Sequence, residues 1–161
     1  MGLSADDRFE IQDLLLQYAA HNTGDEAVLF EVFTEDVELE GPRGYWRGAE
    51  GLQGFYEQSG PPDPDSRGPL VTNVLVDGDG DEATMTAQIL QVKGKPGSER
   101  AIGTGWYECT ARRVDGRWKL SKRITHIDGL PLFRDTPAYQ SGARWVRRDG
   151  GWALEPAATS E

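Results

Sequence analysis

The chain has 161 residues, with 17 Lys and Arg against 27 Asp and Glu, which gives a formal net charge of −10 at pH 7. This length fits one domain, and the acidic balance argues against nucleic acid and anionic membrane surfaces as partners, because phosphate binding needs a basic surface. The single cysteine, Cys109, excludes an intrachain disulfide and a cysteine-rich zinc site, and with only His21 and His126 we expect no metal centre. The sequence has neither a signal peptide nor an apolar run of membrane-spanning length, so we expect a cytoplasmic protein.

Three segments in the first third of the chain have the apolar spacing of amphipathic helices. Residues 4–22 carry apolar side chains at i, i+3, i+4 and i+7, and Ser4 suits the N-cap position. A second, short helix opens at Asp25, and a third spans residues 48–58. Their inward faces are expected to hold Ile11, Leu14, Leu15, Tyr18, Val28, Leu29, Val32, Phe33, Leu52, Phe55 and Tyr56.

The rest of the chain favours strands. Short strands at 37–40 and 45–47 flank a Gly-Pro-Arg-Gly turn, and the proline-rich segment 60–69 is expected to be a loop. Long strands joined by glycine-rich turns are predicted at 70–77, 83–94, 100–113 and 117–128, and a last hairpin at 143–148 and 152–154. Helices followed by a meander of antiparallel strands predict an α+β fold, with the helices packed on one face of the sheet.

Several short motifs occur along this pattern in a characteristic order. They are Tyr18-Ala19-Ala20 with Asn22-Thr23-Gly24-Asp25, Leu29–Phe33 with Thr34-Glu35-Asp36-Val37, Arg47–Leu52, Leu70–Val74 and Asp115–Leu120. In this order they resemble the SnoaL-like branch of the nuclear transport factor 2-like superfamily. The resemblance implies a conical α+β barrel over residues 1–133, in which helices cap a curved, mainly antiparallel sheet around an apolar cavity. Residues 134–161 would then form a C-terminal extension with the hairpin.

The resemblance also implies a range of activities that need no cofactor. The superfamily includes dehydratases, a hexachlorocyclohexane dehydrochlorinase, ketosteroid isomerase, polyketide cyclases, an epoxide hydrolase, carbon–carbon lyases and non-catalytic subunits of ring-hydroxylating dioxygenases. The dehydratases and the dehydrochlorinase use a His–Asp dyad. In this chain Asn22 stands at the position of the aspartate and Pro69 at that of the histidine, so proton abstraction by the usual dyad is not expected.

Two regions supply the candidate catalytic residues. At the end of the first helix, Tyr18 and His21 would lie beside Asn22, where the family pocket is located; His21 could instead be a helix C-terminal histidine and Tyr18 a core residue. Arg123 stands where the resemblance to the dehydrochlorinase places an arginine in the pocket. Strict strand alternation, however, puts it on the outer face opposite Trp118, unless a β-bulge re-aims it.

Further candidates occupy the long strands and the aromatic positions. His126 and Asp128 share a strand face and could replace the missing dyad, or could simply form a solvated strand end. Glu108 shares parity with Trp106, whereas Tyr107 points to the opposite face, so at most one of the two aromatic side chains lines the cone. The residues expected to bind substrate are Tyr45, Trp46, Phe55, Trp106, Glu108 and Asp128, and Cys109 is expected to be a buried structural thiol.

The leading hypothesis is a cofactor-independent lyase or isomerase that acts on a small hydrophobic, aromatic or polycyclic substrate by acid–base catalysis. Its catalytic set would be Tyr18, His21, Asn22, Arg123 and His126. The alternatives are a non-catalytic ligand-binding or oxygenase-associated module, and an epoxide hydrolase or polyketide cyclase. The resemblance further implies a homodimer or homotrimer, and the C-terminal hairpin would cover a neighbouring subunit or close the mouth of the cone.

Overall fold

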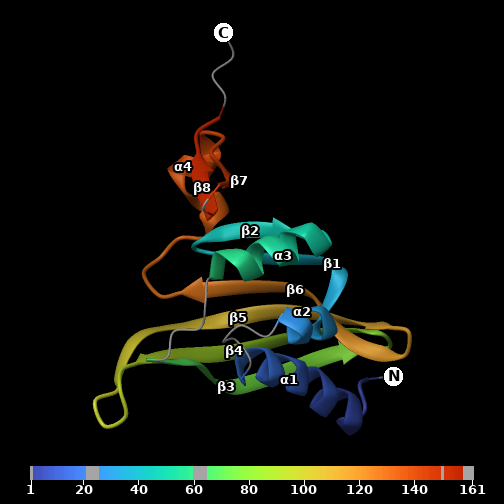
Figure 1. Cartoon of the computed structure of the whole chain (residues 1–161). Coiled ribbons are helices and arrows are strands. Elements are labelled where there is room, and N and C mark those ends of the chain that lie inside the picture. Colours follow the sequence, from blue (N-terminus) through green and yellow to red (C-terminus); the bar gives the residue numbers. More distant parts are fainter. Residues whose placement is uncertain (1, 21–25, 60–64, 150, 158–161) are drawn as a thin grey trace.

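The computed structural model describes residues 2–20, 26–59, 65–149 and 151–157. Helices lie on one face of a six-stranded sheet, and a small C-terminal unit projects from one edge of that sheet (Figure 1). Among the described residues, no helix combines the length and the apolar character needed to span a bilayer. The elements of the main body are α1 (Ala5–Ala20), α2 (Glu26–Val32), β1 (Phe33–Gly41), β2 (Gly44–Arg47), α3 (Gly48–Ser59), β3 (Ser66–Asp79), β4 (Glu82–Lys93), β5 (Arg100–Val114) and β6 (Arg117–Ile127).

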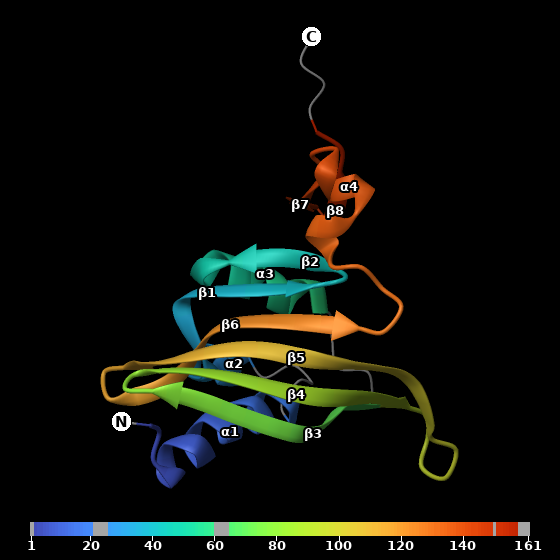
Figure 2. The same ribbon diagram turned by 180° about the vertical axis from the view of Figure 1, so that it is seen from behind.

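The sheet has the strand order β2-β1-β6-β5-β4-β3 and does not close into a full barrel. All neighbouring strands are antiparallel except β1 and β6, which run parallel. Seen from behind, the strands form a continuous curved surface, with α1, α2 and α3 beyond it (Figure 2). The predicted α+β architecture, with helices covering one face of a curved, mainly antiparallel sheet, is therefore confirmed.

The helix α1 forms as its sequence predicts. The Ser4 hydroxyl accepts a hydrogen bond from the Asp7 amide at 3.1 Å, and the Asp7 carboxylate accepts in return from the Ser4 amide at 3.3 Å, so the first turn is capped from both directions. The same carboxylate accepts from Trp118 Nε1 at 2.9 Å and from Arg113 at 2.6 Å, which ties the start of the helix to β5 and β6.

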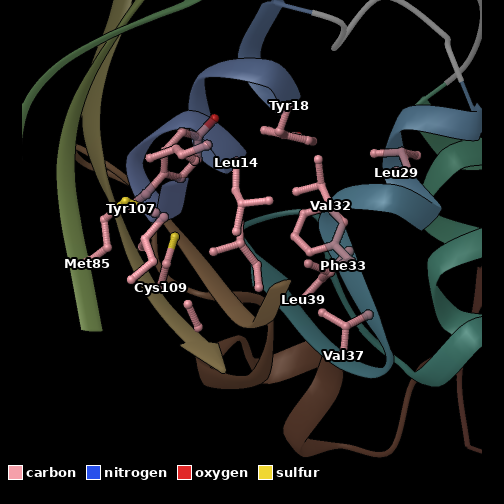
Figure 3. Close-up of a cluster of buried hydrophobic side chains, with 14 of the residues drawn as sticks. Leu14, Tyr18, Leu29, Val32, Phe33, Val37, Leu39, Met85, Tyr107 and Cys109 are labelled. Atoms are coloured by element: carbon pink, nitrogen blue, oxygen red, sulfur yellow. The ribbon is translucent and has the colours of Figure 1, made fainter. Parts of the chain in front are cut away.

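The core lies between the helices and the concave face of the sheet. Helix residues such as Leu14 and Tyr18 meet strand residues such as Tyr107 and Cys109, and Phe33 belongs to the same cluster (Figure 3). Along β4 and β5 every second residue is buried, which is the period of a sheet with one covered face. Burial of these side chains fixes which residues of the long strands face the helices.

Two irregularities interrupt this alternation. In β3 the pairing shifts between Thr72 and Leu75, and Asn73 between them has φ = 51°. In β6 Thr110 pairs with Lys122 whereas Ala111 pairs with Leu120, so Ser121 is an extra residue on that strand. The strand β3 begins at Ser66, so the loop predicted over residues 60–69 extends too far toward the C-terminus. Pro69 is tolerated in this strand because β3 lies at the edge of the sheet.

The C-terminal extension contains η1 (Phe133–Asp135), α4 (Pro137–Gln140), and the predicted hairpin as β7 (Arg144–Arg148) and β8 (Gly151–Glu155). Two of its contacts with the main body are made by tryptophans. Trp145 Nε1 donates to the Arg43 carbonyl at 2.8 Å, and Trp152 Nε1 donates to the Glu57 carboxylate at 3.3 Å. The extension therefore rests on the β1–β2 turn and on α3.

Candidate functional site

A cavity of about 290 Å³ opens on the concave face of the sheet, between α1, α3 and the strands. Such a concave, mainly apolar site with a few polar groups is the expected form of a small-molecule pocket. Its lining residues are Tyr18, Glu40, Gly41, Pro42, Arg43, Trp46, Phe55, Gln91, Tyr107, Arg123, Thr125, Ile127 and Leu130.

Arg123 is the centre of this cavity. The residue is 3 % exposed, and its Nε and one terminal nitrogen (NH1) have no hydrogen-bond partner among the described residues. Its guanidinium carbon lies 4.1 Å from the centroid of the Tyr18 ring, 5.1 Å from that of Phe55 and 5.4 Å from that of Tyr107. Aromatic faces attract a cation, but they do not accept all of its N–H groups. The cavity thus holds a positive charge with unused donors.

The extra residue in β6 explains why Arg123 points inward. Trp118 and Leu120 are buried on the core side, and strict alternation would send Arg123 to the other side. The bulge at Ser121 shifts the phase by one residue, so Arg123 and Thr125 line the cavity. The resemblance predicted this orientation correctly, and the alternation without a bulge predicted it wrongly.

Hydroxyl and thiol groups beside Arg123 are strongly buried. Burial raises the pKa of the Tyr107 hydroxyl far above its ordinary value, and it raises the pKa of the Cys109 thiol to about 12. Both groups are therefore protonated at neutral pH. Tyr18 is 3 % exposed and lines the cavity, so its ring packs in the core while the residue also borders the ligand space. Cys109 is a buried free thiol, as the sequence predicts.

Trp46 and Phe55 take the places predicted for substrate-binding residues. Both line the cavity, and their rings pack edge to face with centroids 5.2 Å apart. Trp46 Nε1 is buried without a hydrogen-bond partner. Because Leu39 is in register with both Trp46 and Arg123, all three side chains lie on the same face of the sheet. A further buried N–H donor without a partner among the described residues therefore lies in a residue that lines the cavity.

Tyr45 was also expected to bind substrate, and the structure places it elsewhere. In register with Glu40, it lies on the opposite face of the sheet, where its ring stacks under Arg134 at 4.2 Å. Arg134 also donates two hydrogen bonds to the Glu40 carboxylate, at 2.8 and 2.6 Å. Glu40 therefore borders the cavity because of its position in β1, whereas its carboxylate lies on the other face of the sheet and binds Arg134.

Four further candidates lie on the outer face of β5 and β6, away from the cavity. The Trp106 ring stacks on His126 with centroids 4.4 Å apart, and His126 Nε2 lies 3.2 Å from the Glu108 carboxylate. Asp128 accepts a hydrogen bond from the Thr104 hydroxyl at 2.5 Å. The alternation along β5 puts Trp106 and Glu108 outside because Tyr107 points inside. The structure brings these residues together as a surface cluster, in which Glu108 is half exposed and pairs with His126 of the neighbouring strand.

The two remaining candidates, His21 and Asn22, lie outside the described residues. Pro69 is buried in β3 and pairs with Gln91, which lines the cavity. A proline side chain at this position has no proton to exchange, which agrees with the loss of the usual dyad histidine.

Tyr107, Gln91 and Thr125 line the cavity but were not expected as site residues. The opposite parity of Trp106 and Tyr107 indicated that one of them faces the cavity, and Trp106 was predicted wrongly because both residues are aromatic. Gln91 and Thr125 give no such signal, since polar residues near strand ends are ordinarily solvated.

The described residues contain no group of three or more His, Cys, Asp or Glu side chains that could hold a metal ion. The described lining supplies hydrogen-bond donors around the buried cation of Arg123. A guanidinium and an indole N–H can bind and stabilise an oxyanion, and a tyrosine hydroxyl can donate a hydrogen bond.

Comparison with known proteins gives the same fold. The model for a SnoaL-like domain matches residues 4–124. A protein of unknown function with a cystatin-like fold from Nostoc punctiforme is 28 % identical, with a TM-score of 0.71, over 81 % of this chain and 98 % of its own. A protein from Novosphingobium aromaticivorans, proposed to be an aromatic ring hydroxylase, is 27 % identical, with a TM-score of 0.63, over 81 % of this chain and 94 % of its own.

A more distant similarity concerns an enzyme. A hexachlorocyclohexane dehydrochlorinase from Novosphingobium barchaimii is 20 % identical, with a TM-score of 0.62, over 81 % of this chain and 92 % of its own, which shows a shared fold alone. No curated protein matches the sequence.

Proposed function

Because the chain belongs to the SnoaL-like domain family, we propose that it is a cofactor-independent lyase or isomerase for a small hydrophobic, aromatic substrate held in the cone cavity. The observation that carries this proposal is the buried guanidinium of Arg123, which has two nitrogens without partners in an aromatic pocket. A cation in a water-poor site stabilises charge that develops on a substrate oxygen, and this is commonly the largest single contribution to catalysis.

The proposed reaction begins with removal of a proton from a carbon next to a carbonyl or similar group. The electron pair of that C–H bond moves to the oxygen, which becomes an oxyanion held by Arg123. Elimination or dehydration follows when this electron pair returns and expels a leaving group from the neighbouring carbon, and isomerisation follows when a proton is added at another carbon. Carbon–carbon cleavage begins instead with removal of a β-hydroxyl proton, and the electron pair of the broken C–C bond then moves to the oxygen held by Arg123. Tyr18, at the wall of the same cavity, is the proposed proton donor, and His21 is the proposed base.

The experiment is a panel of aromatic β-hydroxy and 1,3-dicarbonyl compounds incubated with the protein in D₂O. Exchange of the acidic C–H, loss of water and carbon–carbon cleavage are each visible by NMR. We expect at least one compound to react, and we expect the Arg123→Met variant to lose about 100-fold or more of that rate, the effect of removing an oxyanion donor. Reaction unaffected in Arg123→Met, or no exchange with any compound, would count against an enzyme.

A second candidate function is a ligand-binding or oxygenase-associated module without catalysis. It is favoured by the described lining of the cavity, in which the Glu40 carboxylate is engaged by Arg134. The resemblance also implies that Pro69, which pairs with the lining residue Gln91, stands at the position of the usual base. The similarity to a proposed ring hydroxylase is compatible with such a role. Ligand binding without exchange or turnover in the D₂O experiment would support it.

A further inference from the structure

The cone cavity holds a charge for which the described residues provide no counterion. Glu40 is the one lining residue with a carboxylate, and both of its oxygens accept from Arg134 on the other face of the sheet. Arg123 is surrounded instead by ring faces, the nearest at 4.1 Å. A buried cation ordinarily has an anionic partner, because the loss of hydration is otherwise not offset. The missing partner is therefore expected to come from a ligand.

The unused donors of the site define what that ligand must present. Arg123 offers Nε and NH1, which lie on different edges of the planar guanidinium, so a carboxylate can accept from either of them while its charge compensates the cation. Trp46 Nε1 is an additional buried donor beside the same cavity. A neutral carbonyl would also accept a hydrogen bond but would leave the charge of Arg123 uncompensated, whereas a carboxylate neutralises it.

The size and lining of the cavity define the rest of the ligand. Its volume is about 290 Å³. An apolar cavity of about 150 Å³ holds one benzene ring, so this cavity has room for one or two rings. Phe55, Ile127 and Leu130 supply apolar surface around that space. The lining contains the exposed Arg43 and the buried Arg123, and one carboxylate is enough to compensate the buried charge.

We propose that the ligand of this site is an aromatic or bicyclic monocarboxylate, already charged before any reaction, whose carboxylate pairs with Arg123. The proposal rests on the site of the proposed function but requires no turnover. Binding of such an anion supplies the opposite charge, and a hydrogen bond, that the described residues do not provide to these nitrogens of Arg123. The charge of Arg123 thus selects ligands in the ground state, in addition to any role in a transition state.

The test is a set of matched acid and amide pairs measured by calorimetry: benzoate, phenylacetate, 1-naphthoate and 2-naphthoate, each with its carboxamide. For the best-fitting pair we expect the acid to bind at least about 30-fold more tightly than the amide, the scale of a buried charge pair. In Arg123→Met this preference should fall to about 3-fold or less, while amide binding persists. The matched control is Arg112→Met, which removes an equal charge from an exposed pair with Asp36 and should keep the preference.

A second variant protects the test against misfolding of Arg123→Met. Trp46→Phe removes the indole N–H and keeps a ring, so acid affinity should fall several-fold more than amide affinity. Equal affinities for acid and amide, an acid preference retained in Arg123→Met, or no acid bound at up to about 10 mM would overturn the proposal. Acid binding with no reaction in D₂O would leave it standing and remove the enzymatic function instead.

Discussion

Arg123 is expected to destabilise the free protein, and replacing it by methionine tests this directly. The guanidinium is 3 % exposed, so it has lost its hydration, which costs several kcal/mol even after the surroundings relax. Two of its nitrogens lack partners, and each unsatisfied buried donor adds about 1–3 kcal/mol. The contacts with the rings of Tyr18, Phe33, Phe55 and Tyr107 offset part of this, at about 0.5–2 kcal/mol for each close one.

Methionine at position 123 removes the charge and the donors while filling most of the volume beside the rings. Replacement of buried ionic groups by apolar side chains of similar size is neutral or stabilises by about 1–4 kcal/mol. Because the ring contacts are lost as well, we expect Arg123→Met to raise the free energy of unfolding by about 1–2 kcal/mol. This corresponds to an increase in Tm of about 2–8 °C for a chain of this size.

The assay is equilibrium unfolding in urea followed by tryptophan fluorescence, with an unchanged m value as evidence that the folded state keeps its compactness. Arg112→Met is the control, because its guanidinium is 42 % exposed and its loss should change stability by less than about 0.5 kcal/mol. A loss of more than about 1 kcal/mol in Arg123→Met would show that the guanidinium stabilises the free protein, and the argument for a missing anionic partner would then fail.

Three further predictions concern the rest of the fold. Hydrogen bonds from Trp118, Arg113 and Ser4 hold the pKa of Asp7 well below its usual 3.8, so the stability it provides is present above about pH 4 and is lost below it. The difference in free energy of unfolding between the unmodified protein and Asp7→Asn, measured in urea, should therefore shrink as the pH falls from 4 to about 2. Since burial raises the pKa of Cys109 to about 12, thiol reagents at pH 8 should react at least about 100-fold faster in urea than with the folded protein. Arg134→Met leaves the Glu40 carboxylate, 4 % exposed, without its partner, and should lower the free energy of unfolding by about 2 kcal/mol in thermal or urea unfolding. Arg147→Met, which removes the exposed partner of Glu57, should not lower it to that extent.

The parts of the fold that depend on neighbouring residues were predictable from the sequence. The Ser4 cap forms through contacts within the first turn of α1. The turn between β5 and β6 contains Asp115 and Gly116 with φ of 51° and 79°, the left-handed backbone that an Asp-Gly pair favours in a two-residue hairpin. Such local preferences need no knowledge of the tertiary structure.

The orientation of side chains in the site was only partly predictable. Tyr45 and Trp106 have the aromatic character of pocket residues, yet each lies on the outer face, because pairing with Glu40 and with His126 fixes its side. The apolar pattern of a strand does not tell which aromatic residue faces the helices when neighbouring positions are both aromatic, as at 106 and 107. That choice depends on the register with strands distant in the sequence.

The bulge at Ser121 connects the stability of the fold to the proposed site. Before the bulge, Trp118 and Leu120 fill the core; after it, Arg123 and Thr125 line the cavity. The same sequence paired without a bulge would keep Trp118 and Leu120 in the core and would turn Arg123 to the outer face of the sheet, where a guanidinium can be hydrated. The bulge therefore brings a charge into a place that is unfavourable for folding. A feature that opposes stability and also lines a cavity is expected where function requires it, which is the physical reason to regard Arg123 as the residue that defines the ligand.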